Sequence, residues 1–325
     1  MSRSDTGIGD IESAAARLEG IAIETPLLTC AELDELAGGR VLLKPECLQR
    51  TGSFKIRGAY NLMSRLSDEQ RRAGVVAWSS GNHAQGVAAA GSLLGIRTAI
   101  VMPEDAPASK IENTRRLGGE TILYDRYTGD REQIAREVAA QRGCSLVPSY
   151  EHPHIIAGQG TVGLEIMRQC GDAPPDQVLL ACSGGGLSAG SAIAVKARSS
   201  ATAVYGVEPA GFDDTARSLA AGERVMNVPG ARSICDALLA PTPGAMTFEI
   251  NRRLLEDALV VSDDEVRAAM RFALRALKLV VEPGGAVGLA AVLAGRLDCA
   301  GRRTVVVLSG GNVDVELYAA IQRGA

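Results

Sequence analysis

One lysine and three small-residue turns are the parts of this chain whose types and spacing could carry chemistry. Lys55 follows Phe54 at the expected start of a helix that runs from Ser53 to about Leu66. The run Ser183-Gly184-Gly185-Gly186-Leu187 lies far downstream, between a short apolar run and a helical pattern. Bare amides at the start of a helix bind phosphate, and glycine lets the anion approach the backbone closely. The chain therefore combines an amine with a candidate phosphate cradle.

The other two turns offer polar groups for a ring and for a carboxylate. Ser309 ends a very apolar strand, where its hydroxyl could hydrogen-bond a ring nitrogen. The run Ser79-Ser80-Gly81-Asn82-His83 joins a strand to a helix, and its amides and hydroxyls suit one carboxylate. Plain N-capping by Ser80 or Asn82 is the alternative. Taken together, an amine, a phosphate cradle and a small hydroxyl are the parts that hold pyridoxal 5′-phosphate (PLP).

The glycine turn also admits a dinucleotide-binding interpretation. Gly184, Gly186 and Ala189 fit the pattern G-x-G-x-x-A, and Glu208 ends the next strand, where a ribose-binding acid belongs. A nicotinamide-dependent oxidoreductase is therefore a rival hypothesis. That fingerprint usually begins its domain, whereas this one lies in mid-chain and leaves the other turns unexplained. A non-catalytic amino-acid-binding module is the third hypothesis.

A short acidic loop is the candidate metal site. The run from Glu208 to Asp214 holds three carboxylates just after a strand. Mg²⁺ and Ca²⁺ prefer such oxygen ligands. A solvated loop with Asp213 or Asp214 as a helix N-cap is the simpler interpretation, and the three histidines of the chain show no metal-binding pattern.

Composition excludes several classes of protein. The 325 residues are 46% hydrophobic, and the net charge of −4 comes from interspersed charges of both signs, so nucleic acid is not an expected partner. No apolar run reaches membrane length and the N-terminus is polar, so neither a membrane span nor a signal peptide is expected. The seven scattered cysteines include no C-x-x-C pair, which indicates reduced thiols in a cytoplasmic protein.

The elements that must position these turns alternate along the chain. Short apolar runs predict strands at Val75–Trp78, Thr98–Met102, Thr121–Tyr124, Gln177–Cys182, Ala203–Glu208 and Thr304–Leu308. Between them, helices are predicted at Asn82–Leu94, Ala108–Leu117, Arg131–Gln141, Thr161–Gln169, Leu187–Arg198 and Ser262–Leu277, the last opened by a capping box of Ser262 with Glu265. Such alternation predicts an α/β fold with mainly parallel sheets that are covered on both faces. Boundaries near residues 67–74 and 148–153 predict a small domain of residues 68–150 and a large one of residues 1–67 and 151–325.

The same motifs, in the same order, resemble the fold-type II PLP enzymes, in particular the serine/threonine dehydratase and serine racemase group. The resemblance runs from Pro26 to Asn312. Besides the turns above, it rests on Thr25-Pro26-Leu27, Lys44-Pro45-Glu46, Ser53-Phe54-Lys55-Ile56-Arg57-Gly58-Ala59, Ala157-Gly158-Gln159-Gly160-Thr161, Gly206-Val207-Glu208-Pro209, Glu282-Pro283 and Ser309-Gly310-Gly311-Asn312. It implies a tryptophan synthase β-like fold of two open, twisted, mainly parallel sheets, and a homodimer.

The resemblance also implies roles for the motif residues. Lys55 would bind PLP covalently and act as the base, while Ser80 on the opposite face could return the proton. Around the cofactor, Phe54 would pack beside the ring, Asn82 would bond its 3′-oxygen, Ser309 would face its nitrogen, and Ser183, Gly184, Gly185, Gly186 and Leu187 would hold its phosphate. The substrate carboxylate would lie among Ser80, Gly81, Asn82 and His83, and a divalent cation would bind Glu208, the carbonyl of Phe212 and Asp214.

The expected reaction is β-elimination from a small amino acid. L-Threonine and L-serine are the first candidates, each giving a 2-oxo acid and ammonia. Serine racemisation and dehydration of threo-3-hydroxyaspartate are the alternatives. Arg131, at the start of a predicted helix, could reach a second carboxylate, although a solvated arginine on a helix face is the simpler interpretation.

Overall fold

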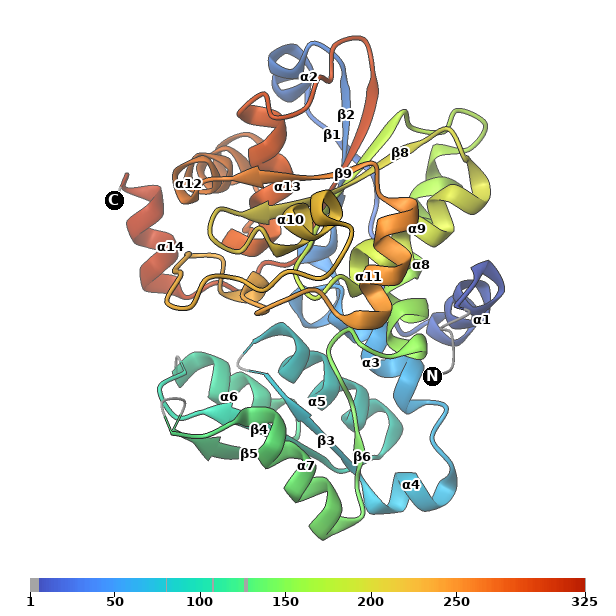
Figure 1. The fold of residues 1–325 in the computed structure, drawn as a ribbon, viewed down its shortest axis with the longest axis vertical. Coiled ribbons are helices and arrows are strands. Elements are labelled where there is room, and N and C mark those ends of the chain that lie inside the picture. Colours follow the sequence, from blue (N-terminus) through green and yellow to red (C-terminus); the bar gives the residue numbers. More distant parts are fainter. Residues whose placement is uncertain (1–5, 80, 107, 126–127, 325) are drawn as a thin grey trace.

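Two separate sheets form the framework of the molecule (Figure 1). The computed structural model describes residues 6–79, 81–106, 108–125 and 128–324. One sheet has six strands in the order β1-β2-β10-β7-β8-β9, and the other has four in the order β5-β4-β3-β6. Every pairing is parallel except that of β1 with β2. The predicted α/β class with two mainly parallel sheets is therefore confirmed.

Strands of the two sheets come from different parts of the chain. The six-stranded unit contains β1 (Leu28–Thr29), β2 (Arg40–Pro45), β7 (Gln177–Ala181), β8 (Ala203–Pro209), β9 (Asp257–Val261) and β10 (Arg303–Leu308). The four-stranded unit contains β3 (Val75–Trp78), β4 (Thr98–Pro103), β5 (Gly119–Tyr124) and β6 (Ser145–Leu146). The exact domain boundaries after residues 67 and 150 stay a prediction.

Helices cover both sheets. They are α1 (Ile8–Leu18), α2 (Ala31–Ala37), α3 (Lys55–Met63), α4 (Asp68–Ala73), α5 (Asn82–Leu94), α6 (Ala108–Arg116), α7 (Arg131–Arg142), α8 (Pro153–Cys170), α9 (Gly186–Arg198), α10 (Asp214–Ala221), α11 (Ala245–Leu254), α12 (Asp263–Phe272), α13 (Pro283–Leu293) and α14 (Val315–Gln322). Short 3₁₀ turns lie at Glu46–Leu48 (η1), Arg50–Gly52 (η2) and Asp236–Leu238 (η3). Among the described residues, no helix is long and apolar enough to cross a membrane.

Apolar side chains on both faces of the central strands explain why the six-stranded sheet is buried. In β10, Val306 and Leu308 join a core with α13, whereas Val305 and Val307 join a second core with α8 and α9. Burial of one such aliphatic side chain contributes about 1.5–3 kcal/mol. A strand buried on both faces carries no polar alternation, as the sequence of β10 shows.

Some elements begin or end differently from the prediction. Helix α8 starts at Pro153 instead of Thr161, because His152 accepts a hydrogen bond from the amide of His154 and so caps it. The capping box of Ser262 with Glu265 is confirmed, although a π-helical segment, Ala273–Leu277, follows α12. Strands β1, β2, β6 and β9 were not predicted.

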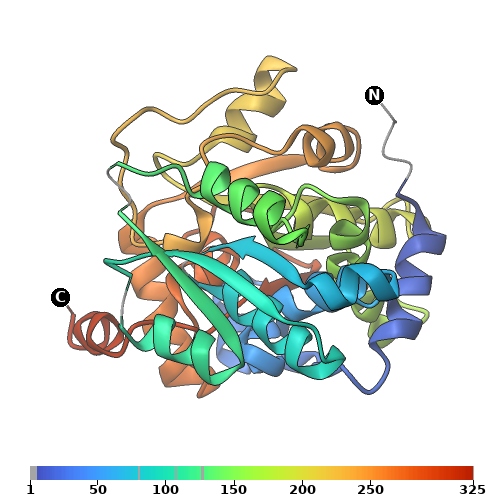
Figure 2. The ribbon, with the colours of Figure 1, turned by 90° about the horizontal axis from the view of Figure 1, so that it is seen from below.

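Pairing of β2 with β10 brings the two ends of the chain together. Arg40 lies opposite Arg303, and the register continues to Pro45 opposite Leu308. Just beyond, the amide of Phe54 donates to the carbonyl of Ser309 at 3.2 Å. The turn before Lys55 therefore lies against the turn after β10. Figure 2 shows the four-stranded unit across the underside of this arrangement.

Candidate active site

Lys55 is the first residue of α3, and its amine is held inside the protein. Its Nζ donates a hydrogen bond to the carbonyl of Ser149 at 3.1 Å and lies 5.0 Å from the centre of the Phe54 ring. Burial lowers the pKa of Lys55 to about 8, and the charge of Glu282 opposes that change. A lysine with a lowered pKa is a nucleophile and a base near neutral pH.

A glycine cradle lies at the start of α9. Gly185 has a φ of 88°, which favours glycine. A methyl group on Gly184 would lie 2.3 Å from the Tyr150 ring, and one on Gly186 would lie 2.4 Å from Gln159 Oε1. The first amides of a helix have no partner inside it, so those at the start of α9 are open to an anion.

The carbonyls of the cradle are fixed from the opposite side by α11. Thr247 Oγ1 donates to the carbonyl of Gly184 at 2.6 Å, and Asn251 Nδ2 donates to that of Gly185 at 3.4 Å. Gln159 Nε2 donates at 3.1 Å to the same Ser149 carbonyl that Lys55 contacts. The carbonyl of Ser149 therefore accepts hydrogen bonds both from Lys55 and from Gln159, the side chain that packs on Gly186.

The buried carboxyl group of Glu282 lies at the turn of Asn82, which the side chain of Asn312 joins to the turn after β10. Asn82 Nδ2 donates to Glu282 Oε1 at 2.5 Å, and Asn312 Nδ2 donates to Asn82 Oδ1 at 2.8 Å. Burial, followed by the charge of Asp236, raises the pKa of Glu282 to about 8. The suggestion that Asn82 caps α5 is wrong, because the cap position is Gly81 and Asn82 turns towards Glu282.

The residues present fit PLP. Ser53 Oγ and His83 Nδ1 are buried without a hydrogen-bond partner in the described part of the chain. Ser309 is 5% exposed and lies beside the Lys55 turn through the bond from Phe54 to its carbonyl. A buried polar atom without a partner is costly unless a ligand satisfies it. The structure thus brings Lys55 to the Ser309 turn and links it to the cradle through Ser149.

The turn of residues 79–83, called the carboxylate turn below, is only partly described by the structure. Ser80 lies outside the described residues. His83 Nε2 donates to the carbonyl of Val147 at 2.8 Å, which leaves Nδ1 as the acceptor. Burial, followed by the charge of Lys55, lowers the pKa of His83 to about 3, so this ring is neutral at physiological pH.

Glu208 does not have the surroundings of a ribose-binding acid. It is fully buried, and its two oxygens accept hydrogen bonds from the amides of Thr215 and Ala216 at 3.1 and 3.0 Å. Its carboxylate therefore caps α10 instead of facing an open cleft. This geometry removes the main support for the nicotinamide hypothesis.

The same loop keeps one feature of a cation site. Asp214 Oδ1 accepts from Asn227 Nδ2 at 2.6 Å, whereas Asp214 Oδ2 is buried without a partner in the described part of the chain. Burial raises the pKa of Glu208 to about 8 and that of Asp214 to about 6. Within the described ranges, no group of three or more His, Cys, Asp or Glu side chains could hold a metal. A cation would therefore need the main-chain oxygen of Phe212 as well.

Sequence reasoning missed two residues of the site. Glu282 belongs to a recognised motif but received no role, and Tyr150 was not singled out. The signal for Glu282 was present, because it is a lone acid in an apolar stretch that runs from Leu279 to Leu293. A buried acid of this kind is often functional. The packing of Tyr150 on Gly184 has no local signal in the sequence.

Comparison with known proteins agrees with this geometry. The family described as "Pyridoxal-phosphate dependent enzyme" matches residues 18–310. An L-threo-3-hydroxyaspartate ammonia-lyase of Pseudomonas sp. is 46% identical over 97% of this chain and 98% of its own. A serine racemase of Schizosaccharomyces pombe is 39% identical, over 95% of each chain. The solved structure of maize serine racemase has a TM-score of 0.92 and 38% identity, and the match covers 98% of both chains. This protein is therefore a member of the PLP-dependent enzyme family, in the group of ammonia-lyases and racemases.

Proposed function

We propose that the protein eliminates water from β-hydroxy amino acids and releases a 2-oxo acid and ammonia, with L-threo-3-hydroxyaspartate as the preferred substrate. Two relatives with that activity, from Pseudomonas sp. and Saccharomyces cerevisiae, are 46% and 41% identical to this chain. The observation that carries the substrate preference is a polar cavity beside the carboxylate turn, with an arginine at its edge.

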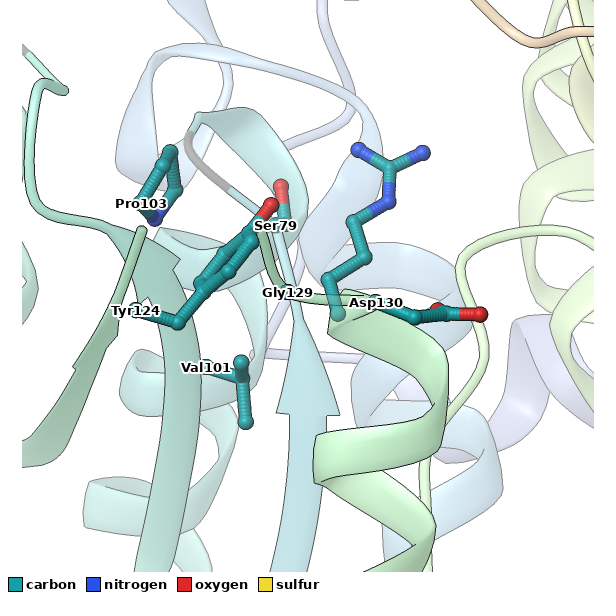
Figure 3. Close-up of a pocket in the computed structure, with 7 residues that line it drawn as sticks. Ser79, Val101, Pro103, Tyr124, Gly129 and Asp130 are labelled. Atoms are coloured by element: carbon teal, nitrogen blue, oxygen red, sulfur yellow. The ribbon is translucent and has the colours of Figure 1, made fainter. Parts of the chain in front are cut away.

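This cavity lies at the carboxyl ends of β3, β4 and β5 (Figure 3). It has a volume of about 270 Å³, and its lining includes Ser79, Tyr124, Asp130 and Arg131. The hydroxyls of Ser79 and Tyr124 lie in the same space above the strand ends. Arg131 is exposed, and its side chain makes no hydrogen bond or ion pair within the described residues. A guanidinium group without a partner suits a carboxylate, which it binds in a bidentate geometry.

The position of Arg131 also relates this cavity to the cradle. Burial, followed by the charges of Glu132 and Glu151, raises the pKa of Tyr150, and the charge of Arg131 opposes that change. Tyr150 packs on Gly184, so the charge of Arg131 acts on a side chain that contacts the cradle. A substrate with a second carboxylate could then extend from the turn at Ser79 towards Arg131.

The reaction follows from the chemistry of the residues present. PLP supplies an electron sink for negative charge at the α-carbon of the substrate. Lys55 takes the α-proton, because its lowered pKa leaves part of its amine unprotonated. The β-hydroxyl leaves as water with one proton, which the α-proton taken by Lys55 balances. The released enamine then tautomerises to an imine, and water hydrolyses this imine to the 2-oxo acid and ammonia. Ser309 offers a neutral hydroxyl, which favours prompt loss of the β-substituent over transamination.

The pKa of Lys55 leads to a pH prediction. An amine acts as a base only when it is unprotonated, so kcat should rise as the pH passes about 8 and then level off. The measurement is ammonia release with saturating substrate between about pH 6 and about pH 10, with the enzyme kept loaded with PLP. A profile that falls over this range would contradict the assignment of Lys55.

Replacement of Arg131 tests the substrate. Arg131→Met should lower kcat/KM for L-threo-3-hydroxyaspartate about 10- to 100-fold, the usual worth of a hydrogen bond to a charged group. It should change kcat/KM for L-serine less than about threefold, because serine has no second carboxylate. Arg136→Met is the matched control, since Arg136 lies on the same helix in an exposed pair with Glu132. Equal losses for both substrates would refute the preference.

L-Threonine and L-serine remain the second candidates. A threonine ammonia-lyase of Thermotoga maritima is 41% identical over 96% of this chain. Racemisation would need a proton donor opposite Lys55, the role assigned to Ser80. Chiral analysis of serine after incubation with the enzyme separates racemisation from elimination.

The acidic loop supports a cation proposal. We place Mg²⁺ or Ca²⁺ at Glu208, Asp214 and the carbonyl of Phe212, because Asp214 Oδ2 is buried without a partner in the described residues. Added Mg²⁺ should raise the unfolding temperature of the wild type by a few degrees, since a ligand that binds only the folded state stabilises it. The rise should vanish with EDTA and in Asp214→Asn. An equal rise in Asp214→Asn would disprove this site.

We also infer a homodimer from the family resemblance, and a cytoplasmic location from the seven scattered cysteines without a C-x-x-C pair. Sedimentation equilibrium of the holoenzyme tests the first inference, and fractionation of the source cells tests the second.

A further inference from the structure

Lys110 is a buried lysine that none of the roles above uses. It lies on α6 of the four-stranded unit and is 9% exposed. Its Nζ forms an ion pair with Asp236 in η3 of the six-stranded unit. The side chain of Lys110 is 11% exposed, whereas that of Asp236 is 49% exposed. The two partners therefore differ in freedom, because Asp236 can turn to solvent and Lys110 cannot.

The ammonium group of Lys110 lies beside the carboxylate turn. A methyl group on Gly81 would be 3.9 Å from Lys110 Nζ. Gly81 precedes α5, whose first amides have no partner within the helix. An anion bound to those amides would lie within reach of this ammonium group.

The side chains of the described part of the turn carry no positive charge. His83 is neutral, because Nε2 donates to Val147 and the low pKa of the ring keeps Nδ1 bare. Asn82 is uncharged, and its amide is held by Glu282 and Asn312. A carboxylate placed here would meet dipoles alone unless a neighbouring cation took part. Burial of an unpaired carboxylate is costly.

We propose that Lys110 binds the α-carboxylate of the substrate, and that Asp236 forms an ion pair with the ammonium group of Lys110 until the substrate binds. One carboxylate then replaces another at the same cation, so the net charge beside Glu282 is unchanged. The exchange favours the substrate, because a half-exposed ion pair stabilises little, whereas a desolvated, charge-assisted bond is stronger. The inference rests on the carboxylate site proposed at residues 79–83.

The single tryptophan of the chain offers a binding signal. Trp78 ends β3 and directly precedes Ser79 at the carboxylate turn. Its fluorescence in the holoenzyme can follow the binding of α-methyl-L-serine and α-methyl-L-aspartate. Both compounds lack the α-hydrogen, so neither can react by elimination, and they differ in the second carboxylate.

Four variants define the experiment. Lys110→Met should raise the Kd of both probes by the same factor, about 10- to 100-fold, since each carries one α-carboxylate. Lys110→Arg should recover most of the affinity. Asp236→Asn should lower both Kd values, because it removes the internal competitor. Lys196→Met, which removes a half-buried lysine of α9 whose Nζ donates only to the carbonyl of Ser200 among the described residues, should leave both Kd values unchanged.

Other outcomes would overturn the inference. A loss confined to α-methyl-L-aspartate would assign Lys110 to the second carboxylate. Unchanged Kd values in Lys110→Met, or weaker binding in Asp236→Asn, would make the ion pair a purely structural contact between the units. The absence of any binding to the wild type would remove the carboxylate site itself. A preference for serine over hydroxyaspartate would refute the proposed substrate but would not alter the common loss in Lys110→Met.

Discussion

Ammonia release is expected to stop when Lys55 is replaced by alanine. Removal of a positioned base lowers the rate by about 10²–10⁴-fold, and loss of the covalent link to PLP adds to this effect. Lys55 is the residue whose amine is held by Ser149 beside the Phe54 ring. The measurement is 2-oxo acid formation at saturating PLP, together with the absorbance of the purified protein at about 410 nm, which should disappear.

The control for this variant is Lys196→Ala, which removes a half-buried lysine on α9 that donates to the carbonyl of Ser200. It should keep both the absorbance band and the activity. A Lys55→Ala protein that retains the absorbance band and loses it on borohydride reduction, or that turns over substrate at the wild-type rate, would show that another amine holds the cofactor.

The second large effect is expected on stability. Arg57 is fully buried and pairs with Glu46 at 2.8 Å and with Glu165 at 2.5 Å. Arg57→Met should lower the free energy of unfolding by about 3–5 kcal/mol, because Glu46 would be left in the interior without its main cation. The measurement is urea denaturation followed by circular dichroism. Since Arg57 lies on α3, cofactor binding at Lys55 should weaken as well.

Arg40→Met is the matched control for Arg57→Met. Arg40 pairs with Asp34 at 2.7 Å, but its side chain is 56% exposed. Exposed pairs contribute about 0–1 kcal/mol, so the stability should hardly change. Similar losses in the two variants would show that the buried network is no more valuable than a surface pair.

Local signals in the sequence were enough to predict the central strands and the glycine cradle. Val75–Trp78 agrees with β3, and the strand predicted at Thr304–Leu308 lies within β10. These strands are continuous apolar runs, so their own sequences indicate burial on both faces. The glycine run before Leu187 was also interpretable, because only a backbone that must approach an anion needs several glycines together.

Contacts between distant segments could not be predicted in the same way. Lys110 and Asp236 are 126 residues apart, and each has the appearance of a surface charge in its own segment. Asn82 has the features of a helix cap, yet its amide bonds Glu282, 200 residues away. Strand β2 ends in a lysine and a proline, and Lys44 is buried with Glu165 of α8, the carbonyl of Thr25 and the side chain of Gln169 as partners. In each case, a residue that is distant in the sequence determines the burial or the hydrogen bonding of the side chain.

The glycines of the cradle show a further limit of local reasoning. Access for an anion explained why Gly184 and Gly186 are glycines. The structure adds that Tyr150 and Gln159 pack where their side chains would be. Two physical reasons coincide at one motif, and only the first is visible in the chain itself.

The pairing of β2 with β10 has a consequence for biosynthesis. Lys44 in β2 can pair with Val307 in β10 only after Val307 has been synthesised. At roughly 5–20 residues per second, this happens some 15–50 seconds after the synthesis of Lys44. During that interval the nascent polypeptide exposes the apolar edge of β2 that later pairs with β10, and it lacks the Ser309 side of the proposed PLP site. A translational pause or truncation upstream of β10 should therefore yield an aggregation-prone apoprotein that chaperones must shield.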